Sequence, residues 1–191
     1  MSDRAGLNPA RLFLALWPDI EVCAGLAAMG GRLREQLSGR LTRPETIHLT
    51  LVFIGDLARD RIPELIDGLT KISVPAFRIE FDRAGCWRHN HIAYLAPSRP
   101  PEELLNLVEG LEAALNELTV GFDRRPYRPH VTLVRKADCE KANPAGSRVS
   151  NSPVWGDFRP IIWSAKHFAL MESVTTPDGV RYENLGSFRL L

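Results

Sequence analysis

The sequence is poor in cysteine and carries almost no net charge. Its three cysteines, Cys23, Cys86 and Cys139, are widely spaced and form no C-x-x-C pair. This pattern argues against a disulfide framework, so we expect reduced thiols that pack as small apolar side chains. The formal net charge of +1 argues against the broad basic surface of a non-specific nucleic-acid binder. A bound phosphate would therefore be held by individual arginines.

Long apolar runs and phosphate-binding signatures are also missing. The apolar run near the N-terminus covers residues 12–17 and stops at Pro18. It is too short to cross a membrane or to form the core of a signal peptide, so we expect a cytoplasmic protein with no membrane association. The sequence contains no glycine-rich phosphate loop and no dinucleotide-binding fingerprint.

The remaining composition is typical of a globular protein. Hydrophobic residues make up 45% and charged residues 25% of the 191 residues, enough for one domain or for two small lobes that share a core. Apolar patterns and their breaks predict strands at residues 11–17, 48–54, 76–81, 92–95, 130–134, 164–173 and 180–190. Helical periodicity predicts helices over residues 20–37 (capped by Asp19), 58–72 and 102–118. Residues 136–160, rich in Pro, Gly, Ser and Asn, predict a loop or a lid.

The second half of the chain repeats the plan of the first. Each half contains a strand, a helix and then a strand that begins with His-x-Thr-Leu. The interval from Leu12 to His48 nearly equals the interval from Ile92 to His130. We infer two similar lobes related by an internal pseudo-twofold axis.

The two His-x-Thr-Leu motifs are the strongest functional signal. Residues two apart on a strand share a face, so His48 lies beside Thr50 and His130 beside Thr132. A twofold relation would bring both pairs to one cleft. Histidine titrates near neutrality, so one imidazole can accept a proton while its mate donates one, as phosphodiester cleavage requires. A single such histidine is more often an ordinary strand residue, but two in equivalent places favour catalysis.

These motifs and their flanks resemble those of the 2H phosphoesterase superfamily, specifically the bacterial RNA 2',3'-cyclic phosphodiesterases once described as 2'-5' RNA ligases. The matching segments span nearly the whole chain: RLFLALWP, HLTLVFIG, RPYRPHVTLVRK, PVWGDF and FALMES…YENLGSF. The resemblance implies an α+β fold of two lobes, each with an antiparallel sheet and outer helices, around a central groove. It also implies one domain over residues 1–191, in which the two lobes interleave, and a monomer.

The resemblance further implies the reaction, which is hydrolysis of a cyclic phosphate to a 2'-phosphate without a metal or other cofactor. His48 would be the proton donor to the leaving oxygen, and His130 the proton acceptor from water. The partner would be RNA with a 2',3'-cyclic phosphate end, or a cyclic nucleotide. Two alternatives stay open: 2'-5' ligation of tRNA halves on the same site, and a non-catalytic RNA or nucleotide-binding module.

Further residues could bind the substrate. Thr50 and Thr132 can hydrogen-bond phosphate oxygens. Arg128 shares the face of His130 if Pro129 leaves the alternation intact, whereas Arg135 requires a strand end or a bulge to reach that face.

Several other residues give weaker signals. His89 and His91 lack further metal ligands nearby and predict a turn. His167 stands alone in a late strand and predicts a structural residue. Some aromatic residues could stack a base or line the groove, although packing in the core is the more common role. They are Phe13, Trp87, Tyr127, Trp155 and Trp163.

Overall fold

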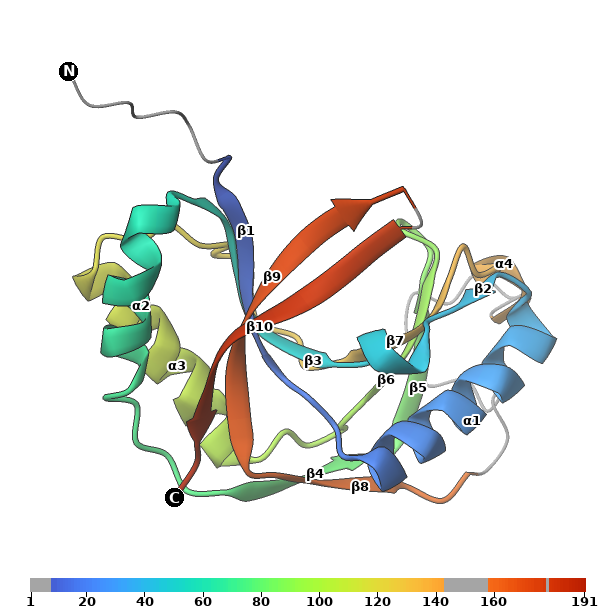
Figure 1. Cartoon of the computed structure of the whole chain (residues 1–191). Coiled ribbons are helices and arrows are strands. Elements are labelled where there is room, and N and C mark those ends of the chain that lie inside the picture. Colours follow the sequence, from blue (N-terminus) through green and yellow to red (C-terminus); the bar gives the residue numbers. More distant parts are fainter. Residues whose placement is uncertain (1–7, 143–157, 178) are drawn as a thin grey trace.

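A computed structural model describes residues 8–142, 158–177 and 179–191 (Figure 1). Its strands are β1 (Ala10–Leu16), β2 (Arg40–Leu41), β3 (Leu49–Leu57), β4 (Phe77–Phe81), β5 (Arg83–Trp87), β6 (Ile92–Ala96), β7 (Val131–Arg135), β8 (Ile161–Ala165), β9 (His167–Thr176) and β10 (Gly179–Arg189). Its α-helices are α1 (Ile20–Leu37), α2 (Ile62–Leu69), α3 (Glu102–Glu117) and α4 (Cys139–Ala142), and the short 3-10 helices are η1 (Pro44–Thr46) and η2 (Arg59–Arg61). None of these helices is long and apolar enough to span a membrane.

The strands form one antiparallel path and one small separate sheet. The path runs β10-β9-β1-β3-β7-β6-β5, with β2 added beside β7, and β4 pairs with β8. Strands β3 and β7 are joined at a single register pair, Leu49 opposite Val131. Because so little joins them, the path divides there into two lobes. Figure 1 shows α2 and α3 beside one lobe and α1 and α4 beside the other. The predicted two-lobed α+β fold is confirmed.

Each lobe is assembled from both halves of the chain. Helix α1, from the first half, packs against β7, and α3, from the second half, packs against β3. At the C-terminus, β9 and β10 extend the sheet of β1 and β3. The two halves of the sequence are therefore intertwined in space.

Strand β1 is buried on both faces, which separates the main core from a smaller one. Leu12 and Leu14 point into the main core. Phe13 and Ala15 alternate with them and join a smaller cluster with Ala169 and Met171 of β9. This smaller cluster lies on the face of the sheet that also carries the first His-x-Thr motif.

Most predicted elements are present with shifted ends. Asp19 caps α1 as predicted, since its Oδ1 accepts a hydrogen bond of 2.9 Å from the Val22 N–H. The helix predicted at residues 58–72 is shorter, because η2 occupies its first turn. The single strand predicted at residues 164–173 is wrong: β8 and β9 belong to different sheets and are separated only by Lys166. A break of one residue, Lys166, does not interrupt the apolar pattern of the sequence, so the pattern could not show that two strands are present.

The sequence did not predict β5 or α4, nor the short elements β2 and η1. Strand β5, with the sequence RAGCW, lacks a clear two-residue alternation. Helix α4 lies in the segment predicted as a loop or a lid, and residues 143–157 of that segment fall outside the described residues.

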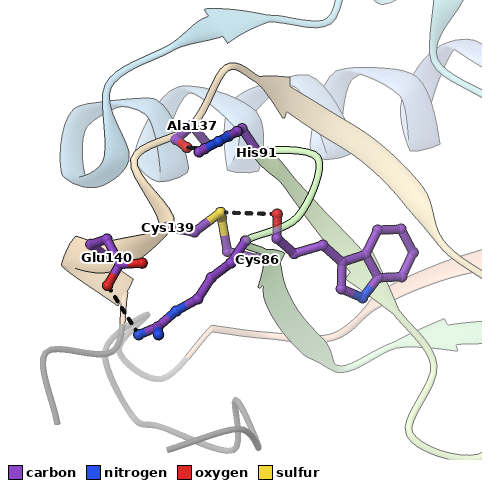
Figure 2. The surroundings of a disulfide bond; sticks show 7 residues. Cys86, His91, Ala137, Cys139 and Glu140 are labelled. Atoms are coloured by element: carbon purple, nitrogen blue, oxygen red, sulfur yellow. Dashed lines mark hydrogen bonds and ion pairs between the residues drawn. A yellow bond between two sulfur atoms is a disulfide. The ribbon is translucent and has the colours of Figure 1, made fainter. Parts of the chain in front are cut away.

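The expectation of three reduced thiols is wrong, because the structure joins Cys86 of β5 to Cys139 of α4 in a disulfide (Figure 2). Their Cα atoms lie 5.5 Å apart, within the usual range for such a bond. Cys23 stays free. The pairing joins residues separated by 53 positions, and only the folded arrangement of β5 and α4 brings them together. Sequence spacing gave no signal for it.

Candidate active site

The junction of β3 and β7 brings the two motifs together. Their register pair has fully buried side chains on both strands. Continued by one residue on either side, this antiparallel register places Thr50 opposite His130 and His48 opposite Thr132. All four side chains are only partly buried, so they occupy the face opposite the core. Side chains in directly opposite positions are neighbours, and the two histidines therefore border one site.

A bulge in each strand follows directly after the threonine. In β3, Leu51 has no partner in β1, and in β7, Leu133 has no partner in β6. A bulge shifts the alternation of side chains by one residue. Leu133 and Val134 are accordingly both buried, whereas Arg135 is exposed. Arg135 thus projects on the side of Thr132, which meets the condition that the sequence analysis set for it.

Each imidazole is oriented by the same backbone contact. Nδ1 of His48 lies 2.8 Å from the carbonyl oxygen of Thr46, and Nδ1 of His130 lies 2.7 Å from that of Arg128. A carbonyl oxygen only accepts, so Nδ1 carries the proton and donates it. The other ring nitrogen, Nε2, then has a free lone pair in the neutral form and is the atom available for proton transfer.

Three aromatic rings surround His48. Trp17 is stacked on it, with ring centroids 4.9 Å apart and planes at 10°. Phe13 and Tyr182 each lie 5.2 Å away. Burial lowers the pKa of His48 to about 4, and the charges of Arg135 and His130 act in the same direction, against the hydrogen bond to the Thr46 carbonyl. The electrostatic effect of His130 is a further sign that the two imidazoles share one site.

Two rings border His130. Trp87 meets it edge-on with centroids 4.5 Å apart, and Tyr94 lies at 5.9 Å. Burial lowers the pKa of His130, the hydrogen bond to the Arg128 carbonyl raises it, and the charge of Arg135 lowers it. Arg135 therefore influences both imidazoles, which places a fixed positive charge within electrostatic reach of each.

A groove of about 460 Å³ opens beside these residues. Three of the predicted site residues line it, namely Thr50, Arg128 and His130. His48, Thr132 and Arg135 are not among its lining residues. Phe53, Trp87 and Tyr127 also line the groove, as do Asp123 and Arg125, which form an ion pair.

The aromatic candidates are divided between the groove and the core. Trp87 and Tyr127 line the groove, whereas Trp163 is 2% exposed and belongs to the main core. Trp155 lies outside the described residues. Phe13 packs against His48 in the smaller core.

The other described histidines lie outside the two motifs, and one of them, His89, also lines the groove. His89 and His91 belong to the turn between β5 and β6, as predicted, and His167 is exposed at the start of β9. Among the described residues, no three His, Cys, Asp or Glu side chains gather in a group that could hold a metal ion.

Sequence reasoning missed three rings that contact the histidines. Trp17, Tyr94 and Tyr182 reach the site through strand pairing, because β1 lies beside β3, β6 beside β7, and β10 beside β9. Tyr94 was within reach of inference, since it lies opposite Thr132 once β6 and β7 are paired. The other two follow only from the register of the folded sheet.

Taken together, the site offers two imidazole nitrogens, two threonine hydroxyls and one guanidinium. The imidazoles can exchange protons, while hydroxyls and a guanidinium stabilise negative charge on phosphate oxygens. This combination suits in-line displacement at a phosphodiester.

Comparison with known proteins agrees with this geometry. The family model described as LigT like Phosphoesterase matches the chain twice, over residues 16–94 and 95–182. One relative is the RNA 2',3'-cyclic phosphodiesterase of Escherichia coli, 28% identical over 130 residues that cover 68% of this chain and 74% of the relative. Another, of the same name, comes from Thermus thermophilus and is 28% identical over 192 residues, covering 94% and 90%.

Solved structures show the same fold. E. coli LigT complexed with 3'-AMP superposes with a TM-score of 0.78 at 24% identity, covering 95% of this chain and 98% of that one. The protein TT0787 of Thermus thermophilus superposes with a TM-score of 0.70 at 26% identity, covering 94% and 97%. Because the family model covers most of the sequence in two consecutive matches, each half of the chain carries the family pattern. The chain belongs to the LigT-like phosphoesterase family.

Proposed function

We propose that this protein hydrolyses the 2',3'-cyclic phosphate at RNA ends to a 2'-phosphate, using His48 and His130 and no metal ion. The observation that carries the proposal is the cross-strand arrangement of the two motifs, with both Nδ1 atoms bonded to backbone carbonyls. The names of the relatives support the same reaction. The 3'-AMP complex of E. coli LigT supports a nucleotide-sized ligand.

In the proposed reaction, water attacks phosphorus while Nε2 of His130 takes a proton from it. The bond from phosphorus to O3' breaks, and protonated Nε2 of His48 gives its proton to O3'. The product is a monoester on O2', and solvent returns the two imidazoles to their starting protonation states. Placing an acid and a base on opposite sides of the phosphorus is what an in-line displacement requires.

Negative charge that develops on the phosphoryl oxygens is stabilised by the rest of the site. The hydroxyls of Thr50 and Thr132 donate hydrogen bonds, and Arg135 supplies a positive charge. Arg128, on the groove wall next to His130, binds the anionic substrate as it enters. All these residues come from one chain, so we propose that the monomer is active.

The low pKa of His48 constrains the order of events. In the empty site, His48 is neutral at pH 7, because burial lowers its pKa to about 4. A proton donor has to be charged, and the negative charge of a bound cyclic phosphate raises the pKa of an imidazole that faces it. His48 therefore takes up its proton together with the substrate.

The test of the reaction uses an oligoribonucleotide with a 2',3'-cyclic phosphate end. We expect a 2'-phosphate product, at the same rate with and without EDTA. Absence of product, or loss of turnover in EDTA that zinc or magnesium restores, would refute the proposal.

A second test separates the roles of the two histidines. A substrate with sulfur in place of O3' has a leaving group that needs no proton, so it bypasses the general acid. We expect this substrate to restore much of the activity of His48→Ala and little of that of His130→Ala. The opposite pattern would exchange the two assignments.

A further inference from the structure

We propose that Trp87 and Tyr94 are positioning residues for His130, and that the Cys86–Cys139 disulfide holds them in place from the opposite face of β5. This inference rests on the proposed function, because His130 is the base of that reaction. It concerns how the imidazole is kept in position rather than what the imidazole does.

Gly85 leaves the space that the Tyr94 ring occupies. It lies opposite Tyr94 in the β5–β6 pair. A Cβ atom at Gly85 would come within 2.5 Å of the Tyr94 ring, a distance that no real side chain tolerates. The Tyr94 ring therefore lies directly over the glycine backbone, and any larger residue at that position would push it away. Tyr94 is also opposite Thr132 on its other side, which brings it to the face that carries the site.

Trp87 is the second ring that contacts His130. It shares a face with Gly85, since the two lie two residues apart on β5. Its ring packs against Tyr94 at 4.2 Å and against His130 at 4.5 Å. The hydrogen bond at Nδ1 fixes one side of the imidazole, and the two rings limit how far the other side can swing. A base must be held within fractions of an ångström of its proton, so this restraint matters for turnover.

The disulfide holds β5 from the face opposite Trp87. Strand β5 is the end of the sheet path and, among the described residues, pairs only with β6. The other edge of its backbone therefore has no neighbouring strand in that part of the chain. Cys86 lies between Gly85 and Trp87 and points to the other face, where it is bonded to Cys139 (Figure 2). The Cys139 sulfur also contacts the Trp87 carbonyl oxygen at 3.4 Å. This covalent tie gives the edge strand a second anchor.

Further contacts reinforce the same junction. The Ala137 N–H donates a hydrogen bond of 2.9 Å to the His91 carbonyl, and Figure 2 shows this pair beside the disulfide. Arg88, the residue after Trp87, forms an ion pair of 3.3 Å with Glu140. Both contacts join the β5–β6 turn to the segment that carries Cys139. Both would remain after loss of the disulfide, and the exposed ion pair is the weaker kind of contact.

Reduction of the bond should therefore act on catalysis. A dithiol reductant delivers two electrons and two protons through a mixed disulfide, which leaves two thiols on the protein and a disulfide on the reductant. We expect β5 to loosen and Trp87 to lose its fixed contact with His130. The threonines and Arg135 lie on β3 and β7 and keep their places, so kcat should fall while KM changes little.

The experiment compares three variants with the wild type: Cys86→Ala/Cys139→Ala, Trp87→Leu and Gly85→Ala. We expect kcat to fall by about tenfold or more in each, as small misplacements of catalytic groups do. KM should stay nearly unchanged in Cys86→Ala/Cys139→Ala and Gly85→Ala, which leave the groove-lining side chains in place. NMR titration of the imidazoles, done without substrate, should show the pKa of His130 raised toward its ordinary value, because water replaces the ring beside it. The pKa of His48 should not move.

Matched controls come from the same chain. Gly31→Ala has no heavy atom within 4 Å of the added carbon, and Cys23→Ala removes the free thiol. Both should keep the kcat and the His130 titration of the wild type. Reduction should lower kcat in the wild type and in Cys23→Ala, but not further in Cys86→Ala/Cys139→Ala.

Unchanged kcat and unchanged His130 titration in folded variants would overturn the inference. If Gly85→Ala fails to fold, Trp87→Phe and reduction of the wild-type protein decide the question in its place. The NMR titration needs no turnover. A wild type without cyclic phosphodiesterase activity would thus refute the proposed function, while the titration would still decide whether Trp87 and Tyr94 restrain His130.

Discussion

His48 and His130 share the same backbone contact and the same strand irregularity, but their aromatic neighbours differ. Both imidazoles donate a hydrogen bond from Nδ1 to the carbonyl two residues earlier, and both strands bulge after the threonine. His48, however, lies among three rings, one of them stacked flat on it. His130 has two rings at its edge. The repeat therefore supplies a symmetric pair of imidazoles, and the neighbouring strands give them unequal surroundings.

The position two residues beyond each bulge shows a second difference. Arg135 occupies this place in β7, and Phe53 occupies the corresponding place in β3. Phe53 lines the groove and has the guanidinium of Arg11 above its ring at 4.9 Å. One lobe thus supplies a charge that reaches both histidines, while the other supplies an apolar wall. We infer that the anion is held mainly from the side of β7.

Replacing either histidine should have the largest effect. His48→Ala and His130→Ala should each lower kcat by about 10²-fold or more, because each removes a general acid or base. Steady-state turnover of a cyclic-phosphate oligonucleotide measures this, with His167→Ala, an exposed histidine on β9, as the control. If one variant kept wild-type turnover, the two sides would not both take part in catalysis.

Arg135→Ala should have the second-largest effect on turnover. Losing a charge-assisted contact of about 1.5–3 kcal/mol corresponds to roughly 10- to 100-fold in kcat/KM. Because the charge of Arg135 lowers the pKa of both histidines, both should titrate at higher pH in the variant. Kinetics and NMR titration report the two effects separately, and Arg78→Ala on β4 is the control. A shift confined to one histidine would show that Arg135 serves one lobe only.

Trp17→Leu should have a smaller effect, confined to the pKa of His48. Removal of the stacked ring admits water to His48, so its pKa should rise from about 4 toward the ordinary 6.5. His130 has no contact with Trp17 among those described and should titrate as before. NMR titration of both imidazoles in one sample makes the comparison, and equal shifts in the two would contradict the separate surroundings.

The last effect concerns stability rather than turnover. His48 has a lowered pKa in the folded protein, so the unfolded chain binds a proton first as the pH falls below about 6.5. The free energy of unfolding should therefore decrease between about pH 6.5 and pH 4 by at most about 1.4 kcal/mol per pH unit from this residue. His130 acts in the same direction. Urea unfolding at several pH values should show a shallower decrease in His48→Gln, and an identical slope would contradict the burial of a neutral imidazole.

The sequence was sufficient for the repeat, the two-lobed fold and the histidine–threonine pairs, because two-residue periodicity and motif spacing are local properties. It was not sufficient for Arg135, whose side depends on a bulge at Leu133 that only pairing with β6 reveals. The rings of Trp17 and Tyr182 reach His48 through strand neighbours distant in the sequence. The Cys86–Cys139 bond depends on the folded arrangement in the same way.

The most direct measurement is a crystal structure of the protein with a nucleoside 2'-monophosphate, the product of the proposed reaction. We expect one phosphate group with oxygens about 3 Å from Nε2 of both His48 and His130, and Arg135 on the same anion. A phosphate bound by only one imidazole, or bound elsewhere in the groove with the two rings turned away from each other, would contradict a shared two-histidine site.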